Sequence, residues 1–384
     1  MLINLRNALM TGKRLPYDAE VEYLEGTGTQ WIDTGIDAFS WPYLEITCKV
    51  NSNYNADYNR GIMGNSNGGS RWQGIAPNGN SGVLFRGYDD ITTISESVTS
   101  DFTTLIFDGP NRTAYAGQTS ATLLSGRGAG NGYGIWAYVG RVAPIAMSVV
   151  SVKIGTSRDN LLFDGIPVRK GTVGYLYDRV SGKLFGNAGT GDFVLGPDVV
   201  PVEYIESHGT EWINTGIFAS ACDEVELSFA VRTTNFRNYI FGCNSSEYGY
   251  VEVSSGNKFK TEYASTYNIS PLTLYKATFK KSDFSVLVNG TTLNLKCGTS
   301  SASLFSRDAN FAISCTAADG KYRGKMLIYE VKLSSNSQTL RSFRPVRVGT
   351  EGAMMDTLTR RIYRNAWTGA FTYGNDLKYP IPAE

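Results

Sequence analysis

The chain of 384 residues lacks the features that identify several common classes of protein. It contains no apolar stretch of about 18 residues, so no membrane-spanning helix is expected. Its first residues carry a charge at Arg6 and have no uninterrupted apolar core, so no secretory signal peptide is expected. Lysine plus arginine (36) nearly cancels aspartate plus glutamate (35), and no long basic run occurs. A nucleic-acid surface is therefore not expected to be its main function.

Chemically reactive residues are also scarce. The single histidine, His208, stands where an otherwise matching phrase has Thr27, so a histidine-based catalytic triad is not expected and a solvated turn is favoured. No phosphate-binding GxxxxGK[ST] motif occurs, and no CxxC pair indicates zinc. The five cysteines are odd in number and predict buried free thiols, although a bridge between Cys243 and Cys315 stays open.

What the chain does have is an internal duplication. The phrase VEYLEGTGTQWIDTGI (21–36) returns as VEYIESHGTEWINTGI (202–217), with 11 of 16 positions identical. A closing phrase at 167–196 returns at 345–374, with 13 of 30 positions identical. Because the chain exceeds the usual size of one hydrophobic core, we expect two domains, 17–197 and 198–384. Residues 1–16, with apolar positions at helical spacing over Leu2–Met10, are expected to form an amino-terminal attachment arm or short helix.

The pattern within each copy predicts an all-β fold. Short alternating segments such as YLEITCKV are separated by clusters of Gly, Asn, Asp and Ser. The duplicated glycines Gly28 and Gly209, with Gly35 and Gly216, are expected at turns that need positive φ or close backbone approach. Each copy should end in a meander.

At the entrance of the meander's first turn, Asp178 in one copy and Asp356 in the other are expected to accept hydrogen bonds from the turn backbone.

The opening phrase at 21–36 and the closing phrase at 167–196 resemble a module of gut bacteria and their phages. That module belongs to the concanavalin A-like lectin/glucanase (laminin-G-like) superfamily. The resemblance covers both copies and implies two tandem jelly-roll β-sandwich domains that bind glycans or protein surfaces. An amino-terminal stub followed by two such modules, without a signal peptide, also resembles phage structural proteins. It implies a virion-surface protein made in the host cytoplasm, attached through residues 1–16 to other virion proteins, and open to homo-oligomer formation.

The same superfamily includes retaining glucanases with an ExDxxE-type carboxylate cluster. The nearest approximations here are Glu224 with Glu226, and Asp89 with Asp90, and they lack that pattern. Calcium, common in the superfamily, is an alternative at Asp33 and at the aligned Asn214, although a hydrogen bond at the strand end is favoured. No other cofactor is expected.

Sugar binding requires an exposed aromatic face together with polar side chains that bind hydroxyl groups. The copies diverge in their middle parts, where ligand contacts are expected because loops vary while frameworks persist. In the first copy we select Trp72, flanked by Arg71 and Gln73. Weaker companions are Trp41, Tyr88, Asp89 and Trp136; the second copy offers Tyr248, Tyr250 and Tyr263 with Glu247.

The hypothesis favoured by the sequence is a non-enzymatic, virion-associated adhesion protein that binds glycans on a host or mucosal surface. A purely structural capsid decoration or fibre protein without glycan affinity is the first alternative. A glycan-cleaving enzyme is the second.

Overall fold

A computed structural model describes residues 15–51, 60–67, 71–79, 82–87, 90–128, 131–139, 143–233, 238–243, 250–253, 258–260, 264–281, 285–289, 291–294, 310–314 and 323–377. The helix expected over Leu2–Met10 lies outside these residues. Leu15, at the end of the expected arm, packs against the buried cluster of Tyr17, Ile166, Val168 and Tyr177. The chain forms two compact units that divide between Asp198 and Val199, except that the short segment Thr359–Arg361 is grouped with the first unit.

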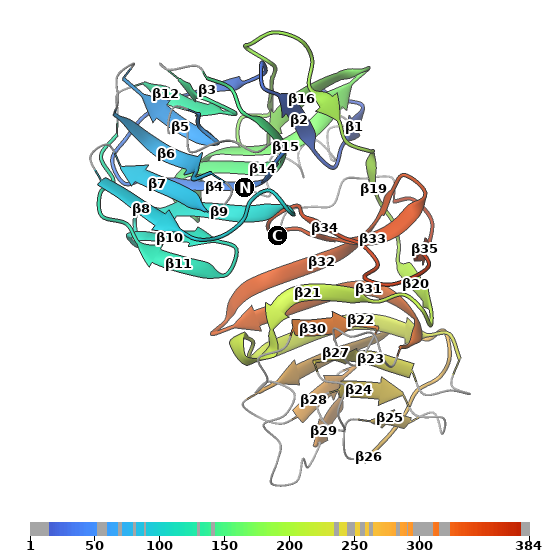
Figure 1. The fold of residues 1–384 in the computed structure, drawn as a ribbon. Coiled ribbons are helices and arrows are strands. Elements are labelled where there is room, and N and C mark those ends of the chain that lie inside the picture. Colours follow the sequence, from blue (N-terminus) through green and yellow to red (C-terminus); the bar gives the residue numbers. More distant parts are fainter. Residues whose placement is uncertain are drawn as a thin grey trace. The chain divides into compact units, whose positions relative to one another are not determined.

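The first unit contains one long antiparallel sheet (Figure 1). In spatial order its strands are β11 (Thr119–Thr122), β10 (Thr113–Ala116), β9 (Thr103–Asp108), β4 (Tyr43–Val50), β14 (Ala146–Ser157), β15 (Asn160–Lys170), β16 (Val173–Asp178) and β17 (Lys183–Phe185). Beside this path, β1 (Ala19–Glu20) pairs with β15, and β2 (Leu24–Thr27) pairs with β14 and β18 (Val194–Leu195).

The second sheet of this unit covers the first. Its order is β3 (Ile32–Asp37), β12 (Gly132–Ile135), β5 (Met63–Ser66), β6 (Trp72–Pro77), β7 (Val83–Gly87) and β8 (Asp90–Ile94), with β13 (Tyr138–Val139) pairing parallel to β5. One core cluster takes side chains from both sheets, such as Leu44 and Ile46 from β4, and Ile75 and Phe85 from β6 and β7.

The second unit repeats this topology strand for strand. Its long sheet runs β29 (Thr291–Asn294), β28 (Ser285–Val288), β27 (Tyr275–Lys280), β22 (Glu224–Val231), β31 (Lys325–Ser335), β32 (Gln338–Val348), β33 (Glu351–Asp356) and β34 (Ile362–Tyr363), joined by β19 (Val199–Pro201), β20 (Ile205–His208) and β35 (Thr372–Tyr373). Its other sheet runs β21 (Ile213–Phe218), β30 (Asn310–Ile313), β23 (Asn238–Gly242), β24 (Tyr250–Val253), β25 (Lys258–Lys260) and β26 (Ala264–Asn268). Only β13 has no counterpart among the described strands.

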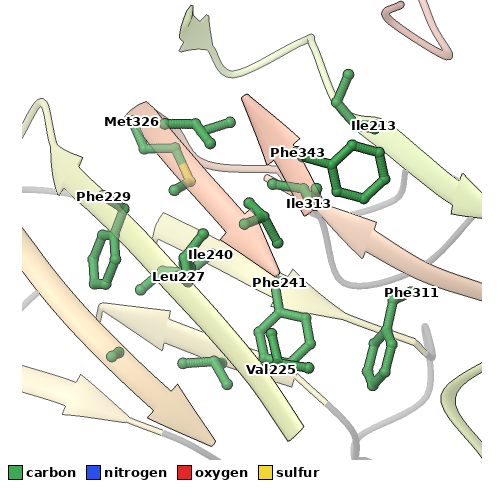
Figure 2. Packing of buried hydrophobic residues seen from close by; sticks show 14 of the residues in the cluster. Ile213, Val225, Leu227, Phe229, Ile240, Phe241, Phe311, Ile313, Met326 and Phe343 are labelled. Atoms are coloured by element: carbon green, nitrogen blue, oxygen red, sulfur yellow. The ribbon is translucent and has the colours of Figure 1, made fainter. Parts of the chain in front are cut away.

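Both units are therefore all-β jelly-roll sandwiches, as the sequence predicted. Among the described residues the only helix is the short 3-10 turn η1 (Ala219–Ala221), and no helix is long and apolar enough to cross a membrane. Figure 2 shows the core of the second unit, where Val225 and Leu227 of β22 meet Phe241 of β23 and Phe311 of β30. The strands alternate: in β22 the core residues Val225 and Leu227 alternate with the outward-facing Glu224 and Glu226.

The opening phrase recurs because it builds a turn that satisfies its own hydrogen bonds. In the first unit the Gln30 side chain accepts hydrogen bonds from the Thr27 N–H (2.8 Å) and the Thr29 N–H (3.4 Å). In the second unit Glu211 does the same for His208 (2.7 Å) and Thr210 (3.3 Å).

The glycines of this phrase have positive φ, as expected. Gly28 and Gly209 have φ of 106° and 101°, and Gly35 and Gly216 have 66° and 68°. A side chain is strained at such angles, which explains why these glycines recur in both copies.

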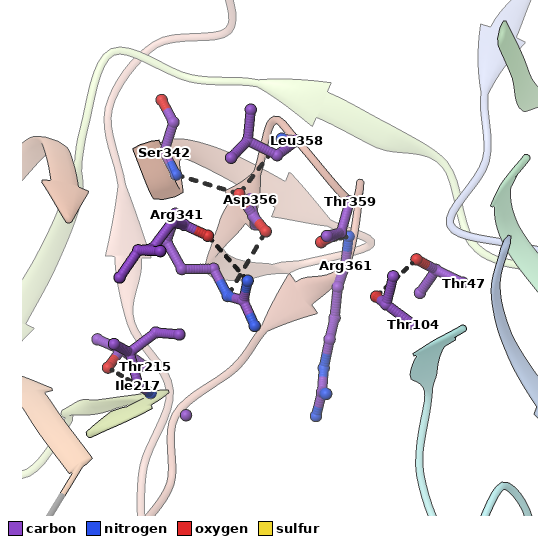
Figure 3. Close-up of polar contacts among 12 residues, drawn as sticks. Thr47, Thr104, Thr215, Ile217, Arg341, Ser342, Asp356, Leu358, Thr359 and Arg361 are labelled. Atoms are coloured by element: carbon purple, nitrogen blue, oxygen red, sulfur yellow. Dashed lines mark hydrogen bonds and ion pairs between the residues drawn. The ribbon is translucent and has the colours of Figure 1, made fainter. Parts of the chain in front are cut away.

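The aspartates of the closing meander also act as expected. Asp178 Oδ1 accepts hydrogen bonds from the Asp164 and Val180 N–H groups (2.8 and 3.1 Å). Asp356 accepts from Ser342 and Leu358 (3.1 and 3.2 Å), as Figure 3 shows. These carboxylates are structural: each joins a turn to the neighbouring long strand.

Each copy ends with the same ion pair. Arg169 binds both carboxylate oxygens of Asp198, and Arg347 binds both of Asp376, with every N–O distance 2.7 Å. This two-pronged geometry is the strong form of an arginine–carboxylate contact. Hydrogen bonding to Arg347 lowers the pKa of Asp376, so the carboxylate keeps its charge further into the acid range.

The single histidine lies in a turn, and the described cysteines lie in the protein interior. The His208 side chain is half-exposed in its turn, in agreement with the solvated turn histidine expected. Cys48 and Cys222 are buried free thiols, and burial raises their pKa values to about 12 and about 11. Cys243 is buried, and Cys315 lies outside the described residues, so a bridge between them stays a hypothesis.

The second unit has Glu211 where the first unit has Gln30, and this difference makes the turn of the second unit sensitive to pH. Burial of Glu211 opposes its ionisation, but hydrogen bonds from Thr210 and from backbone N–H groups outweigh that effect and lower its pKa below the ordinary 4.5. Its stabilising contribution is therefore complete above about pH 4.5 and is lost as the pH falls through the lower, folded-state pKa. The variant Glu211→Gln, which copies the first unit, should lose this dependence.

We expect the difference in melting temperature between wild type and Glu211→Gln to shrink between pH 7 and pH 3.5, as measured by calorimetry. The same change at the exposed Glu351 serves as the control. A difference that is equal at both pH values would contradict the assignment.

Candidate functional site

Trp72, the leading candidate from the sequence, is not an exposed platform. It lies on the face of β6 opposite the main core and is only 2% exposed. Its ring stacks on Tyr138 with centroids 4.8 Å apart, and the Arg86 guanidinium lies 5.4 Å from its centroid. Leu84 and Ala76 complete a small satellite cluster. The expectation that Trp72 offers its face to a sugar is wrong, because neighbouring side chains already cover it.

Gln73 is a structural residue rather than a reader of hydroxyl groups. Its side-chain oxygen accepts from Asn65 Nδ2 (3.0 Å) and from the Tyr133 hydroxyl (2.7 Å). Its nitrogen donates to the backbone oxygens of Phe39 (3.2 Å) and Gly126 (2.8 Å). All four hydrogen-bonding positions of the buried amide are thus occupied, and they tie two loops to β6. The expectation that Gln73 contacts ligand is wrong for this reason.

Trp41 is half-buried at the entrance of β4. The Arg112 guanidinium lies 4.9 Å from its ring centroid, and a Cβ at Gly126 would stand only 2.2 Å from ring atoms. The ring is thus held between an arginine and a glycine backbone, and it also packs against the core. Among the described members of the predicted group around Trp72, Arg71 alone is exposed.

Trp136 is fully buried and its Nε1–H donates to the Met147 carbonyl oxygen (2.8 Å), so the expectation that it contacts a sugar is wrong. The remaining predicted binding residues are not placed by the structure. Tyr88, Asp89, Tyr248, Tyr263 and Glu247 lie outside the described residues, and they stay predictions. Tyr250 begins β24, but its side chain is not described.

Asp33 and Asn214, the alternative calcium ligands, brace turns. Asp33 Oδ1 accepts from the Gly35 N–H (2.9 Å), and Asn214 Oδ1 accepts from the Gly216 N–H (3.0 Å). This is the hydrogen bond that the sequence favoured. Within the described ranges, no cluster of three or more His, Cys, Asp or Glu side chains could hold a metal ion.

Glu224 and Glu226 lie on the outer face of β22, each beside a lysine. Glu224 pairs with Lys280 at 3.4 Å, and Glu226 pairs with Lys332 at 3.2 Å. Glu224 and Glu226 therefore each belong to a surface ion pair.

A candidate site that the sequence analysis did not select lies in the loop between β34 and β35. Asn365 holds this loop: its Oδ1 accepts from the N–H groups of Trp212 (3.0 Å) and Trp367 (3.1 Å). Its Nδ2 donates to the backbone oxygens of Thr368 (2.9 Å) and Gly369 (3.0 Å). The loop is thereby held in one shape, and it carries Trp367 with 54% of its surface exposed.

The first unit has the same loop without the aromatic side chain. Asn187 Oδ1 accepts from the N–H groups of Trp31 (3.0 Å) and Gly189 (2.8 Å). Gly189, the counterpart of Trp367, has no room for a side chain, since a Cβ there would stand 2.1 Å from the Thr29 carbonyl oxygen. The aromatic surface is therefore particular to the second unit.

Arg323 orients the Trp367 ring. Its guanidinium carbon lies over the ring, 5.0 Å from the centroid, which is a cation–π distance. The site thus combines an exposed aromatic surface with a cationic donor group on a braced loop. The sequence held a signal for it, because AGTG in the first closing phrase becomes AWTG in the second. The expectation that ligand contacts lie in the divergent middle parts of the copies did not extend to this closing phrase.

No protein-family model matches the chain, and no curated protein matches it. Among solved structures, domains LG4-5 of the mouse laminin α1 chain match with 10% identity and a TM-score of 0.29, over 96% of this chain and 99% of that one. The NanB sialidase of Streptococcus pneumoniae, in complex with 2-[(3-chlorobenzyl)ammonio]ethanesulfonate, matches with 10% identity and a TM-score of 0.26, over 91% and 75%. Likenesses at these scores carry no argument about ligand or activity.

The role of Gln73 can be tested by its stability effect. Gln73→Met keeps the size of the side chain but removes all four hydrogen bonds and leaves buried partners unsatisfied. We expect the free energy of unfolding of the first unit to fall by about 3 kcal/mol in urea titrations. The same substitution at Gln118, which is exposed in the β10–β11 turn, should change it by less than about 0.5 kcal/mol. Equal effects of the two variants would argue against the structural role.

Proposed function

We propose that this chain is a non-enzymatic carbohydrate-binding protein whose second unit contacts glycan through Trp367. The observation that carries this proposal is the exposed Trp367 side chain on a loop held by Asn365. Large exposed aromatic side chains on rigid loops are characteristic of binding sites, because they supply contact area at a small cost in entropy. The duplicated scaffold keeps the loop, and only one copy places an indole on it.

Carbohydrate is the ligand class that this chemistry favours. The C–H groups of a pyranose ring pack on an aromatic face, while hydroxyl groups need donors and acceptors at its edge. Arg323, at 5.0 Å from the Trp367 centroid, supplies donors beside the ring. Since it stacks on one side of the indole, the exposed part of Trp367 is available for a sugar.

The absence of catalysis is part of the proposal. Glu224 and Glu226, the best carboxylate pair in the sequence, lie beside Lys280 and Lys332. They are surface ion pairs on the long sheet, and Trp367 lies in the loop between β34 and β35. The proposal assigns them no role in bond cleavage.

The resemblance to phage modules extends the proposal to location. We place the protein on a virion surface, where its lectin-like unit would contact host or mucosal glycans and its first residues would attach it to other virion proteins.

Binding measurements with the full chain test the glycan-binding proposal. We expect glycan arrays to reveal at least one saccharide ligand, and Trp367→Ala to weaken its binding by at least about tenfold, as expected for a hot-spot aromatic residue. Because Trp367 is largely exposed, the melting temperature of the variant should stay close to that of wild type.

Tyr373→Ala removes another partly exposed aromatic side chain from the closing segment and is the matched control. It should leave binding unchanged. If the wild type binds no saccharide on the arrays, or if the Trp367→Ala variant binds as tightly as the wild type, the result would count against the proposal and favour the structural alternative.

A further inference from the structure

Arg323, whose guanidinium lies over the Trp367 ring, has no counter-charge of its own. Its guanidinium carbon stands 5.0 Å from the ring centroid. Within the described part of the chain the guanidinium donates to no oxygen and lies within ion-pair distance of no carboxylate. Of its three nitrogens Nε alone is buried without a partner, so the two Nη groups are accessible at the surface. Because an aromatic ring offers no lone pair to N–H donors, the cation is positioned here but not neutralised.

The backbone places Arg323 beside the loop between β34 and β35. The next residue, Gly324, donates its N–H to the Ser314 carbonyl oxygen (3.1 Å) at the end of β30. β30 pairs with β21, and Trp212, directly before β21, donates its N–H to Asn365 Oδ1 (3.0 Å) in the loop. Two distant parts of the chain are thus held together without a ligand, which lowers the entropic cost of binding one.

The first unit has different residues at this edge. β31 begins at Lys325 and β14 at Ala146, and both strands pair with the opening phrase at equivalent positions. In the first unit Arg60 donates to the Pro144 carbonyl oxygen (3.4 Å), so that cation has an acceptor. An indole and three cations occupy four positions in the second unit where the first unit has small or cyclic side chains. The residues of the second and first units at these positions are Arg323 and Pro144, Lys325 and Ala146, Arg364 and Gly186, and Trp367 and Gly189.

The carboxylates around this site do not cancel those three cations. Glu206 is paired with Arg232 (3.0 Å), and Glu252 lies directly opposite Lys260 in the strand pairing. Glu211 accepts hydrogen bonds from a hydroxyl and an N–H group of its own turn, each at 2.7 Å. With the first two acids matched by cations, Glu211 alone stands against the three cations among these described residues. The surface keeps positive charge, and Arg323 is the cation that lies on the exposed indole.

We propose that this site selects acidic saccharides, and that Arg323 binds their oxyanion, a carboxylate or a sulfate ester. The inference rests on the proposed glycan-binding site and adds the class of sugar that it takes. A guanidinium forms two parallel, charge-assisted hydrogen bonds with an oxyanion, whereas a neutral hydroxyl group leaves its charge unmatched. The pyranose ring that carries the oxyanion packs on the exposed part of Trp367, 54% of whose surface is open.

NMR titration of the full chain with three matched sugars tests this inference. Methyl β-glucoside, methyl β-glucuronide and methyl β-glucoside 6-sulfate share one ring and differ only at its exocyclic carbon. We expect one or both acidic sugars to bind at least about tenfold more tightly than the glucoside, with the preference falling as salt is added. Tighter binding of the glucuronide assigns the site to sugar acids, and tighter binding of the sulfate ester assigns it to sulfated sugars. Either result supports the inference.

Variants of Arg323 test whether this residue is the source of the preference. Arg323→Gln removes the charge and should reduce the preference to less than about twofold. Arg323→Lys keeps the charge without the planar fork and should retain part of the preference, which provides a second variant should Arg323→Gln disturb folding. Lys276→Gln removes a cation from an exposed position on β27 and should leave the preference unchanged.

The outcomes separate this inference from the glycan-binding proposal. If the three sugars bind equally and all lose affinity in Trp367→Ala, the site binds glycan and the inference is overturned. If the preference survives in Trp367→Ala and is lost in Arg323→Gln, selection by Arg323 stands and the role of Trp367 is wrong. A preference that survives in Arg323→Gln, or no binding by any of the three sugars, also overturns the inference.

Discussion

Each unit depends on the burial of apolar side chains between two antiparallel sheets. Residues such as Val225 and Phe241 point into the space between the layers, and the alternation of the strands sends their neighbours to the outer faces. This packing leaves the connecting loops at the surface, where their backbone groups must be satisfied locally. Gln30, Asp178 and Asn187 meet that requirement in the first unit, and Glu211, Asp356 and Asn365 in the second. These are the residues around which the repeated phrases are built.

Duplication of such a scaffold lets the surface of one copy change without loss of the fold. The Asn187 and Asn365 loops share their hydrogen bonds, yet one carries Gly189 and the other Trp367. The long sheets share their pairing, yet Asp108 stands where the other has Lys280. Outward-facing side chains take little part in the core, so their chemistry can diverge at small cost in stability. The proposed glycan-binding surface belongs to the second unit for this reason.

Most of the fold could be predicted from the sequence, because local and repeated sequence patterns specify its strands and turns. Period-two alternation predicted the strands. The duplicated Gly28 and Gly209 predicted turns with positive φ, and the position of Asp178 at a turn predicted that its carboxylate accepts hydrogen bonds from the turn backbone. The candidate site could not be predicted in the same way. Trp72 has the composition of a sugar-binding loop, but Tyr138 and Arg86 cover its ring. The side-chain amide of Gln73 likewise suits hydroxyl recognition, but two distant loops occupy it.

The sequence by itself determined that the chain contains two copies of one all-β sandwich, because hydrophobic alternation, turn glycines and repeated phrases act over short distances. Only the tertiary structure decided which aromatic rings are exposed and which polar side chains meet. Exposure depends on what packs against a side chain from elsewhere in the chain, as Trp72 and Trp367 show with 2% and 54%. Strand pairing likewise joins Asp223, Lys281 and Asn336, which are far apart in the sequence, around one pocket.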